Sequence, residues 1–258
     1  MKKSILTGIL ALAAGASGLM AQAAPAAAGP KGPTPKSKEE LAAIQAMFTA
    51  QQQNNMDGVI KAADDLMTKF ADTEFKELAL YMEAEAYDQK GDPAKAQVYA
   101  EQALALNPKS YQADITLAEL IVKQTREHDL DREEKLGKVE QYANGAMENV
   151  KDAAKPNSQI TDEQWAEFKK GIVARAHNAM GMAGLTRKKY DVAAAEFKTA
   201  AENDPQPTFE VREASALQLL GKNDEAVALC DKVLAEPNLH PQIKQVATQI
   251  KAAASAKK

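Results

Sequence analysis

The sequence has few of the residues that build metal, disulfide or nucleophilic sites. Its 258 residues include one cysteine, Cys230, and three histidines. One cysteine cannot form an internal disulfide bond, and no two of His128, His177 and His240 are spaced four residues apart, as a helical zinc site would require. We therefore expect no metal site, and we interpret Cys230 as a small buried apolar residue.

Motifs of the common enzyme classes are also missing. There is no glycine-rich phosphate loop, no HExxH and no GxSxG. Acids that follow each other directly, such as Glu39-Glu40 and Asp64-Asp65, point about 100° apart on a helix and do not converge on a substrate. We therefore expect no enzyme, no catalytic residue and no cofactor, with an enzyme built from scattered acids as the less favoured alternative.

The first 23 residues have the pattern of a secretory signal peptide. Lys2 and Lys3 precede an uncharged apolar stretch, Ile5–Met20, and Ala21-Gln22-Ala23 has the small-x-small form of a cleavage site. The stretch is shorter than the ~20 residues of a spanning helix. We expect cleavage near Ala23 and export to the periplasm or out of the cell; an N-terminal membrane anchor is the alternative.

The composition of the mature chain indicates an acidic, all-α protein. Removal of residues 1–23 leaves 30 basic against 36 acidic residues, a net charge of −6 with histidine neutral. Nucleic-acid-binding proteins carry basic patches, so we expect no nucleic-acid partner. Alanine is abundant, aromatic residues are only 5%, and valine and isoleucine do not alternate with polar residues. This composition favours helices over strands.

Helical order is expected to begin after a linker. Residues 24–36 are rich in proline, alanine and glycine, which favours an extended spacer. Ser37-Lys38-Glu39-Glu40 and Thr161-Asp162-Glu163-Gln164 are capping boxes, a hydroxyl followed three residues later by an acid or amide. Gly91 and Gly221 are placed to end helices.

An internal repeat is the strongest pattern in the sequence. Seven positions recur with steps of 3, 4, 5, 4, 3 and 5 residues. The first, small residue lets two antiparallel helices approach, the third turns the chain, and the last ends the second helix. Because one hairpin cannot bury its apolar stripe alone, neighbouring hairpins must stack. The clearest copies are Ala84, Tyr87, Gly91, Ala96, Ala100, Ala103 and Pro108; Gly181, Gly184, Lys188, Ala193, Phe197, Ala200 and Pro205; and Ala214, Leu217, Gly221, Ala226, Cys230, Val233 and Asn238. A weaker copy is Met47, Ala50, Asn54, Val59, Ala63, Leu66 and Ala71.

This spacing, most clearly at residues 84–108, resembles that of the tetratricopeptide repeat (TPR) family. The resemblance implies an all-α fold, a right-handed superhelix or solenoid of about five helical hairpins with a capping helix at the C-terminus. The third hairpin departs from the pattern through two insertions, Lys123–Asp131 and Asp152–Ile160. The repeat domain is predicted at 37–258, with units at 38–72, 75–108, 110–151, 161–205 and 207–237 and the cap at 240–256.

The resemblance also implies a binding face. Family members bind ligands on the first helix of each pair, and some hold a carboxylate there with a Lys/Asn/Arg cluster. We do not carry that cluster over, because other residue types occupy several of its positions. A basic or apolar extended segment is the favoured ligand. The residues of this candidate face are Tyr81, Glu85, Asp88, Gln112, Ile115, Glu119, Arg175, Asn178, Met182 and Arg212.

The sequence therefore predicts an exported scaffold or adaptor that holds a partner protein or peptide. By analogy of fold and compartment, cell-envelope assembly is the suggested process. A structural subunit that associates with itself is the alternative, and the sequence does not predict an oligomeric state. Trp165, the only tryptophan, is expected to pack in the core rather than to contact a partner.

Overall fold

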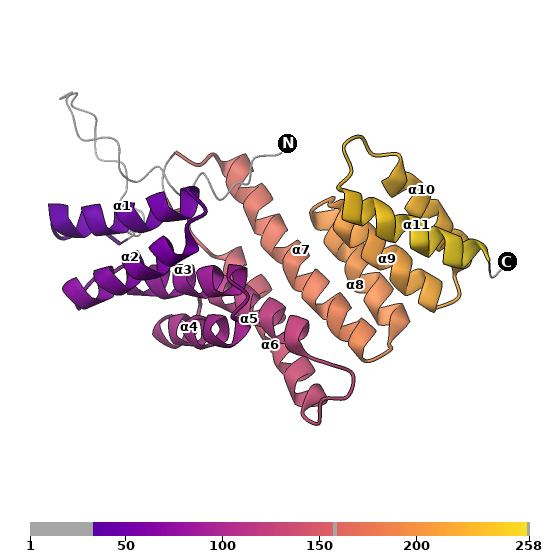
Figure 1. Ribbon diagram of the computed structural model, residues 1–258, viewed down its shortest axis with the longest axis horizontal. Helices are drawn as coiled ribbons and strands as arrows, with labels where there is room; N and C mark the ends of the chain where they lie inside the picture. Colours follow the sequence, from indigo (N-terminus) through magenta and orange to yellow (C-terminus); the bar gives the residue numbers. More distant parts are fainter. Residues whose placement is uncertain (1–32, 157–158, 257–258) are drawn as a thin grey trace. The chain divides into compact units, whose positions relative to one another are not determined.

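The fold is all-α over the residues that the structure describes. The computed structural model describes residues 33–156 and 159–256, and eleven helices are the regular elements found there (Figure 1). The expected signal peptide, residues 1–23, and residues 24–32 of the expected linker lie outside the described residues. The helices are α1 Lys38–Gln52, α2 Met56–Lys69, α3 Lys76–Gln89, α4 Pro93–Leu106, α5 Tyr111–Gln124, α6 Arg132–Lys151, α7 Asp162–Thr186, α8 Tyr190–Asn203, α9 Pro207–Leu219, α10 Asn223–Leu234 and α11 Pro241–Ser255.

The expected fold class, five helical hairpins followed by one further helix, is confirmed. Short turns join α1 to α2, α3 to α4, α7 to α8, and α9 to α10, and α1–α2, α3–α4 and α9–α10 pack as neighbours. A longer connection, between Gln124 and Arg132, joins α5 to α6. The insertions expected in this part of the chain are thus the α5–α6 and α6–α7 connections.

The third position of the three clearest repeat copies and of the weaker first copy turns the chain in the left-handed region. Its φ is +54° at Asn54, +76° at Gly91, +61° at Lys188 and +84° at Gly221. Glycine adopts this conformation without strain, and asparagine does so more readily than most residues. The repeat register therefore located all four turns, including the two that carry no glycine.

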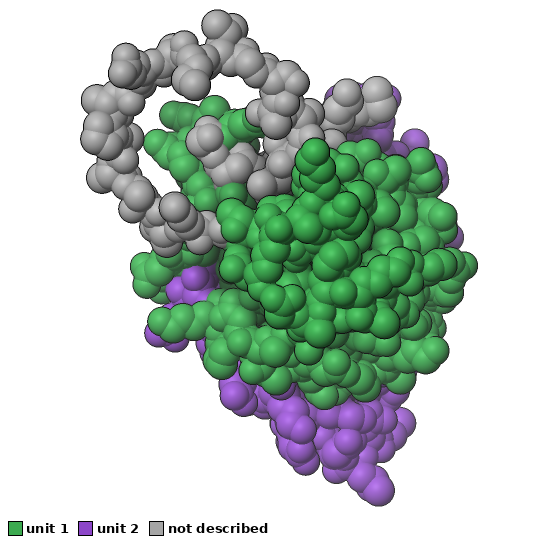
Figure 2. Space-filling model, turned by 90° about the vertical axis from the view of Figure 1, so that its left-hand side faces the viewer, with its two compact units in different colours: residues 1–116, 151–168 green, residues 117–150, 169–258 purple. Residues whose placement is uncertain are grey.

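The described chain divides into two compact units, which Figure 2 distinguishes by colour. Unit 1 contains residues up to Thr116 together with Lys151–Phe168, and unit 2 contains Leu117–Val150 and Lys169 onwards. Helices α5 and α7 contribute residues to both units. This division was not predicted from the sequence, which indicated one continuous repeat domain.

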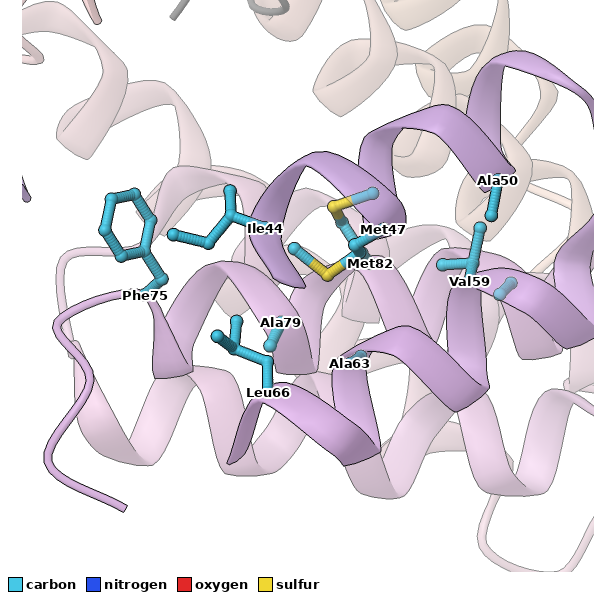
Figure 3. Close-up of a cluster of buried hydrophobic side chains, with 10 residues drawn as sticks. Ile44, Met47, Ala50, Val59, Ala63, Leu66, Phe75, Ala79 and Met82 are labelled. Carbon is cyan, nitrogen blue, oxygen red and sulfur yellow. The ribbon is translucent and has the colours of Figure 1, made fainter. Parts of the chain in front are cut away.

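The core of unit 1 lies among α1, α2 and α3. Figure 3 shows Met47 of α1 next to Met82 of α3, and both belong to one buried cluster with Ile44 of α1 and Leu66 of α2. Met47 and Leu66 are fully buried, and small residues such as Ala63 let the helices approach. Burial of each large apolar side chain contributes about 1.5–3 kcal/mol, so this cluster holds the first three helices together.

The start of α1 is fixed by a buried carboxylate. The Glu40 side chain is 1% exposed, and its Oε1 accepts a 2.6 Å hydrogen bond from the hydroxyl of Thr73, in the loop before α3. Its Oε2 accepts from the backbone amide of Lys36 at 2.5 Å, while the Ser37 hydroxyl accepts from the Glu40 amide at 3.0 Å. The predicted capping box thus forms with one change, because the carboxylate reaches the residue before the cap.

In unit 2, the last helix covers the end of the final hairpin. Ala247 of α11 is fully buried with Val211 of α9 and Val233 of α10, and Ile243 and Ile250 pack against them. Helix α11 contacts both α9 and α10. These contacts are those of a capping helix, which shields apolar surface that a further repeat would otherwise cover.

Candidate functional site

The unit 1 part of the candidate face lies on α3 and α5. Tyr81, Glu85 and Asp88 are spaced by four and three residues, so they share one side of α3, and all three are half-buried. Across from them on α5, the Thr116 hydroxyl donates a 3.3 Å hydrogen bond to Glu85 Oε1, and Gln112 is half-buried. This surface combines an aromatic ring, two acids and an amide.

Ile115 does not belong to the candidate face. Its side chain is only 1% exposed, so it packs in the core and cannot contact a partner in this structure. The whole middle of α5, from Ala113 to Ala118, is buried. A helix that is buried on most sides gives no periodic signal to separate a ligand-facing position from a core position, which is why this prediction was wrong.

In unit 2, two helices of the candidate face are joined by a bidentate ion pair. Arg175 of α7 donates to both carboxylate oxygens of Glu119 on α5, with its Nε 2.9 Å from Oε1 and its Nη2 2.6 Å from Oε2. Both side chains are about one-third exposed. A fork-to-fork pair of this kind fixes the orientation of both side chains, so α5 and α7 present a rigid polar surface.

A second contact continues this surface onto α9. Arg212 of α9 donates a hydrogen bond from Nη1 to the Asn178 Oδ1 of α7. Burial lowers the pKa of Arg212 from its ordinary value, and the charge of Glu119 opposes this effect. Among the described residues, the Arg212 guanidinium bonds an amide, whereas that of Arg175 bonds a carboxylate. The positive charge of Arg212 is therefore less compensated than that of Arg175.

The other unit 2 residues that the sequence singled out have structural roles. Met182 of α7 is half-buried and packs against the core cluster that contains Phe197 of α8. His177 of α7 is paired with Glu196 of α8, its Nδ1 2.7 Å from Oε2, and Cys230 is fully buried. The sequence does not predict the His177–Glu196 pair, because the two residues are on different helices and share no motif.

Trp165 is packed in unit 1. Its side chain is 7% exposed and its ring stacks on Phe168 with the ring centroids 5.1 Å apart. The indole Nε1 donates a 3.2 Å hydrogen bond to the carbonyl oxygen of Ala153, in the α6–α7 connection. Phe168 in turn meets the ring of Tyr111 edge to face at 6.2 Å. The indole therefore ties the α6–α7 connection to the start of α7.

We expect Trp165→Phe to lower the free energy of unfolding by about 1 kcal/mol, because it keeps a ring for stacking but loses the hydrogen bond. Trp165→Ala should cost about 3 kcal/mol, because it also removes the ring. Urea unfolding followed by far-UV circular dichroism measures both values. Equal stability of all three proteins would mean that the indole is not a core element.

The described residues offer no arrangement for metal chemistry or membrane crossing. Over residues 33–156 and 159–256, no group of three or more His, Cys, Asp or Glu side chains could hold a metal ion. Within the same ranges, no helix is long and apolar enough to span a bilayer. The geometry that the candidate face does offer is an array of charged and amide groups on successive first helices.

Comparison with known proteins identifies the repeat and the fold. Residues 77–110 match the profile of the tetratricopeptide repeat family. Among curated protein sequences, none matches the chain. The matched segment covers α4 and all of α3 except its first residue, and these helices form the hairpin in which the repeat spacing is clearest.

Several solved structures share the fold. TTC0263, a thermophilic TPR protein of Thermus thermophilus, is 16% identical with a TM-score of 0.55, over 83% of this chain and 98% of that one. MamA is 13% identical with a TM-score of 0.53, over 81% and 94%. A chain of the APC/C hetero-tetramer Cut9–Hcn1 is 14% identical with a TM-score of 0.62, over 82% and 36%. Residues 77–110 therefore carry a tetratricopeptide repeat, and the chain shares the fold of these solved structures.

Proposed function

We propose that this chain is an exported scaffold that binds a partner protein or peptide through the first helices of its repeats. The fold is one of protein-interaction scaffolds, in which function depends on a surface rather than on a catalytic centre. The observation that carries the proposal is the unit 2 array of Glu119, Arg175, Asn178 and Arg212. These side chains come from three successive first helices, are only partly exposed and are held by hydrogen bonds.

The two units offer partners different chemistry. In unit 1, Tyr81, Glu85 and Asp88 form an aromatic and acidic surface, which suits a basic or apolar segment. In unit 2, the less compensated guanidinium of Arg212 suits a carboxylate of the partner. A preorganised polar surface loses little side-chain entropy on binding, which favours affinity.

A pull-down from envelope extract tests this face. The bait is the chain from residue 24 onwards, compared with Tyr81→Ala for unit 1 and with Glu119→Ala plus Asn178→Ala for unit 2. Loss of a central contact should weaken capture at least tenfold, or by about 1.4 kcal/mol. Glu101→Ala and Gln102→Ala, on the exposed side of the second helix α4, are the matched controls.

Circular dichroism of each variant separates loss of binding from loss of fold. A partner that is captured equally by the wild type and by all face variants would contradict the choice of face. The exported location has its own test, which is N-terminal sequencing of the protein recovered from the envelope. We expect the mature chain to begin near Ala24, and a retained Met1 would contradict export with cleavage.

A further inference from the structure

A buried carboxyl group without a hydrogen-bond partner lies in unit 1. The Glu83 side chain on α3 is 0% exposed, and neither of its carboxylate oxygens has a hydrogen-bond partner among the described residues. An ionised carboxylate in such a place would be strongly unfavourable without a cation or donors to compensate it. The geometry therefore favours the neutral, protonated form of this side chain.

The groups that face Glu83 are acidic or phenolic. Asp64 approaches it from α2 and Tyr99 from α4. The Tyr99 ring stacks on Tyr87 of α3 with the centroids 5.2 Å apart, and Lys95 of α4 lies over the Tyr87 ring, its Nζ 5.0 Å from the centroid. The lysine is thus directed at the outer ring of this stack, while the carboxyl faces another acid.

The electrostatics follow from this arrangement. Burial, assisted by the charge of Asp64, raises the pKa of Glu83 to about 8. Burial, assisted by the charge of Glu83, also raises the pKa of Tyr99 to about 12. Both directions are those of acids that lose water and face negative charge.

We propose that Glu83 is a proton-dependent latch of unit 1. In its protonated form the side chain packs as a neutral group between α2 and α4. When its proton passes to solvent, a negative charge develops inside the helix packing, next to the exposed Asp64, and α2, α3 and α4 loosen. Because α3 also carries Tyr81, Glu85 and Asp88, the latch acts on the helix that presents the unit 1 part of the candidate face.

The direction in which stability changes with pH follows from the raised pKa of Glu83 in the folded protein. In the unfolded chain the carboxyl titrates near the ordinary value of 4.5, whereas in the folded protein it titrates at about 8. The folded state therefore holds one more proton between these values. The stabilisation that this carboxyl group contributes is fully present below pH 4.5, its pKa in the unfolded chain, and is lost as the pH rises toward 8. Between these two values the unfolding constant increases about tenfold per pH unit.

Urea unfolding of the whole chain from about pH 5 to about pH 9 tests the latch. The signal is the fluorescence of Trp165, which lies buried in the same unit. The variants are Glu83→Gln, which resembles the neutral carboxyl, and Asp64→Asn, with Glu101→Gln of exposed α4 as the matched control. The ratio of the wild-type unfolding constant to that of Glu83→Gln should rise about tenfold from pH 6 to 7 and become independent of pH above about pH 8.

The two other variants make the outcome specific. The unfolding constant of Glu101→Gln should depend on pH as that of the wild type does. In Asp64→Asn the unfolding constant should become independent of pH at a lower pH, because the Asp64 charge that helps to raise the pKa of Glu83 is gone. The same pH dependence in wild type and Glu83→Gln would overturn the proposal. If Glu83→Gln did not fold, an unchanged flattening point in Asp64→Asn would overturn it instead.

Discussion

Gly181→Ala is expected to destabilise unit 2 by about 1–3 kcal/mol, although alanine is the better helix former. Gly181 lies in the middle of α7, opposite Phe197 of α8. A Cβ at this position would lie 2.6 Å, 2.7 Å and 2.9 Å from the Cε1, Cδ1 and Cζ atoms of the Phe197 ring. The ring is fully buried and cannot turn away without disturbing its neighbours, so the two helices must separate.

Gly171→Ala is the matched control on the same helix. A Cβ at Gly171 would meet no atom within 4 Å, so this substitution should stabilise the protein by up to about 1 kcal/mol. The midpoints of thermal and urea unfolding, measured by circular dichroism, should therefore rise for Gly171→Ala and fall for Gly181→Ala. Phe197→Leu should partly rescue Gly181→Ala, so the double variant costs less than the sum of the single variants. Equal shifts for Gly171→Ala and Gly181→Ala would show that the contact with Phe197 does not limit α7.

Glu40→Ala is expected to destabilise unit 1 by about 2–4 kcal/mol, because it leaves one buried and one partly buried donor without an acceptor. The donors are the Thr73 hydroxyl and the backbone amide of Lys36, both bonded to the Glu40 carboxylate. The loss also removes the link between the start of α1 and the loop before α3. Urea unfolding followed by Trp165 fluorescence measures the effect in the same unit.

Two further variants separate the hydrogen bonds from the helix start. Glu39→Ala changes an exposed acid in the same turn and should cost about 0.5 kcal/mol or less. Glu40→Gln keeps one acceptor oxygen and should lie between the wild type and Glu40→Ala. Similar losses for Glu39→Ala and Glu40→Ala would mean that only charge near the helix start matters, and not the contact with Thr73.

The contact between Gly181 and Phe197 also shows that the repeat spacing predicts part of the helix packing. The first and fifth positions of the copies pair residues that are not both large: Met47 with Ala63, Ala84 with Ala100, and Gly181 with Phe197. All six are fully buried or nearly so. Because the repeat fixes which positions face each other, a large residue in one helix requires a small one in the other.

The candidate face was only partly predictable. The repeat spacing indicates which helices are the first of each pair, because it depends on residues that are close in sequence, whereas the ligand-facing side of each first helix stays a prediction and is wrong at Ile115. The bond between Arg175 and Glu119 joins residues 56 positions apart, and no local pattern indicates such a pair. Burial of Ile115 likewise depends on everything packed around α5, which the register of α5 alone does not contain.

The sequence by itself determined the all-α class, the helical hairpins, the turn positions at Asn54, Gly91, Lys188 and Gly221, and the last helix as a cap. These features follow from local spacing and from the need of each hairpin to cover its neighbour. Only the tertiary structure decided that Glu40 and Glu83 are buried, and that one has partners while the other has none. Burial and hydrogen bonding of a charged side chain depend on residues that are distant in sequence, so its energetic role appears only when the helices are packed.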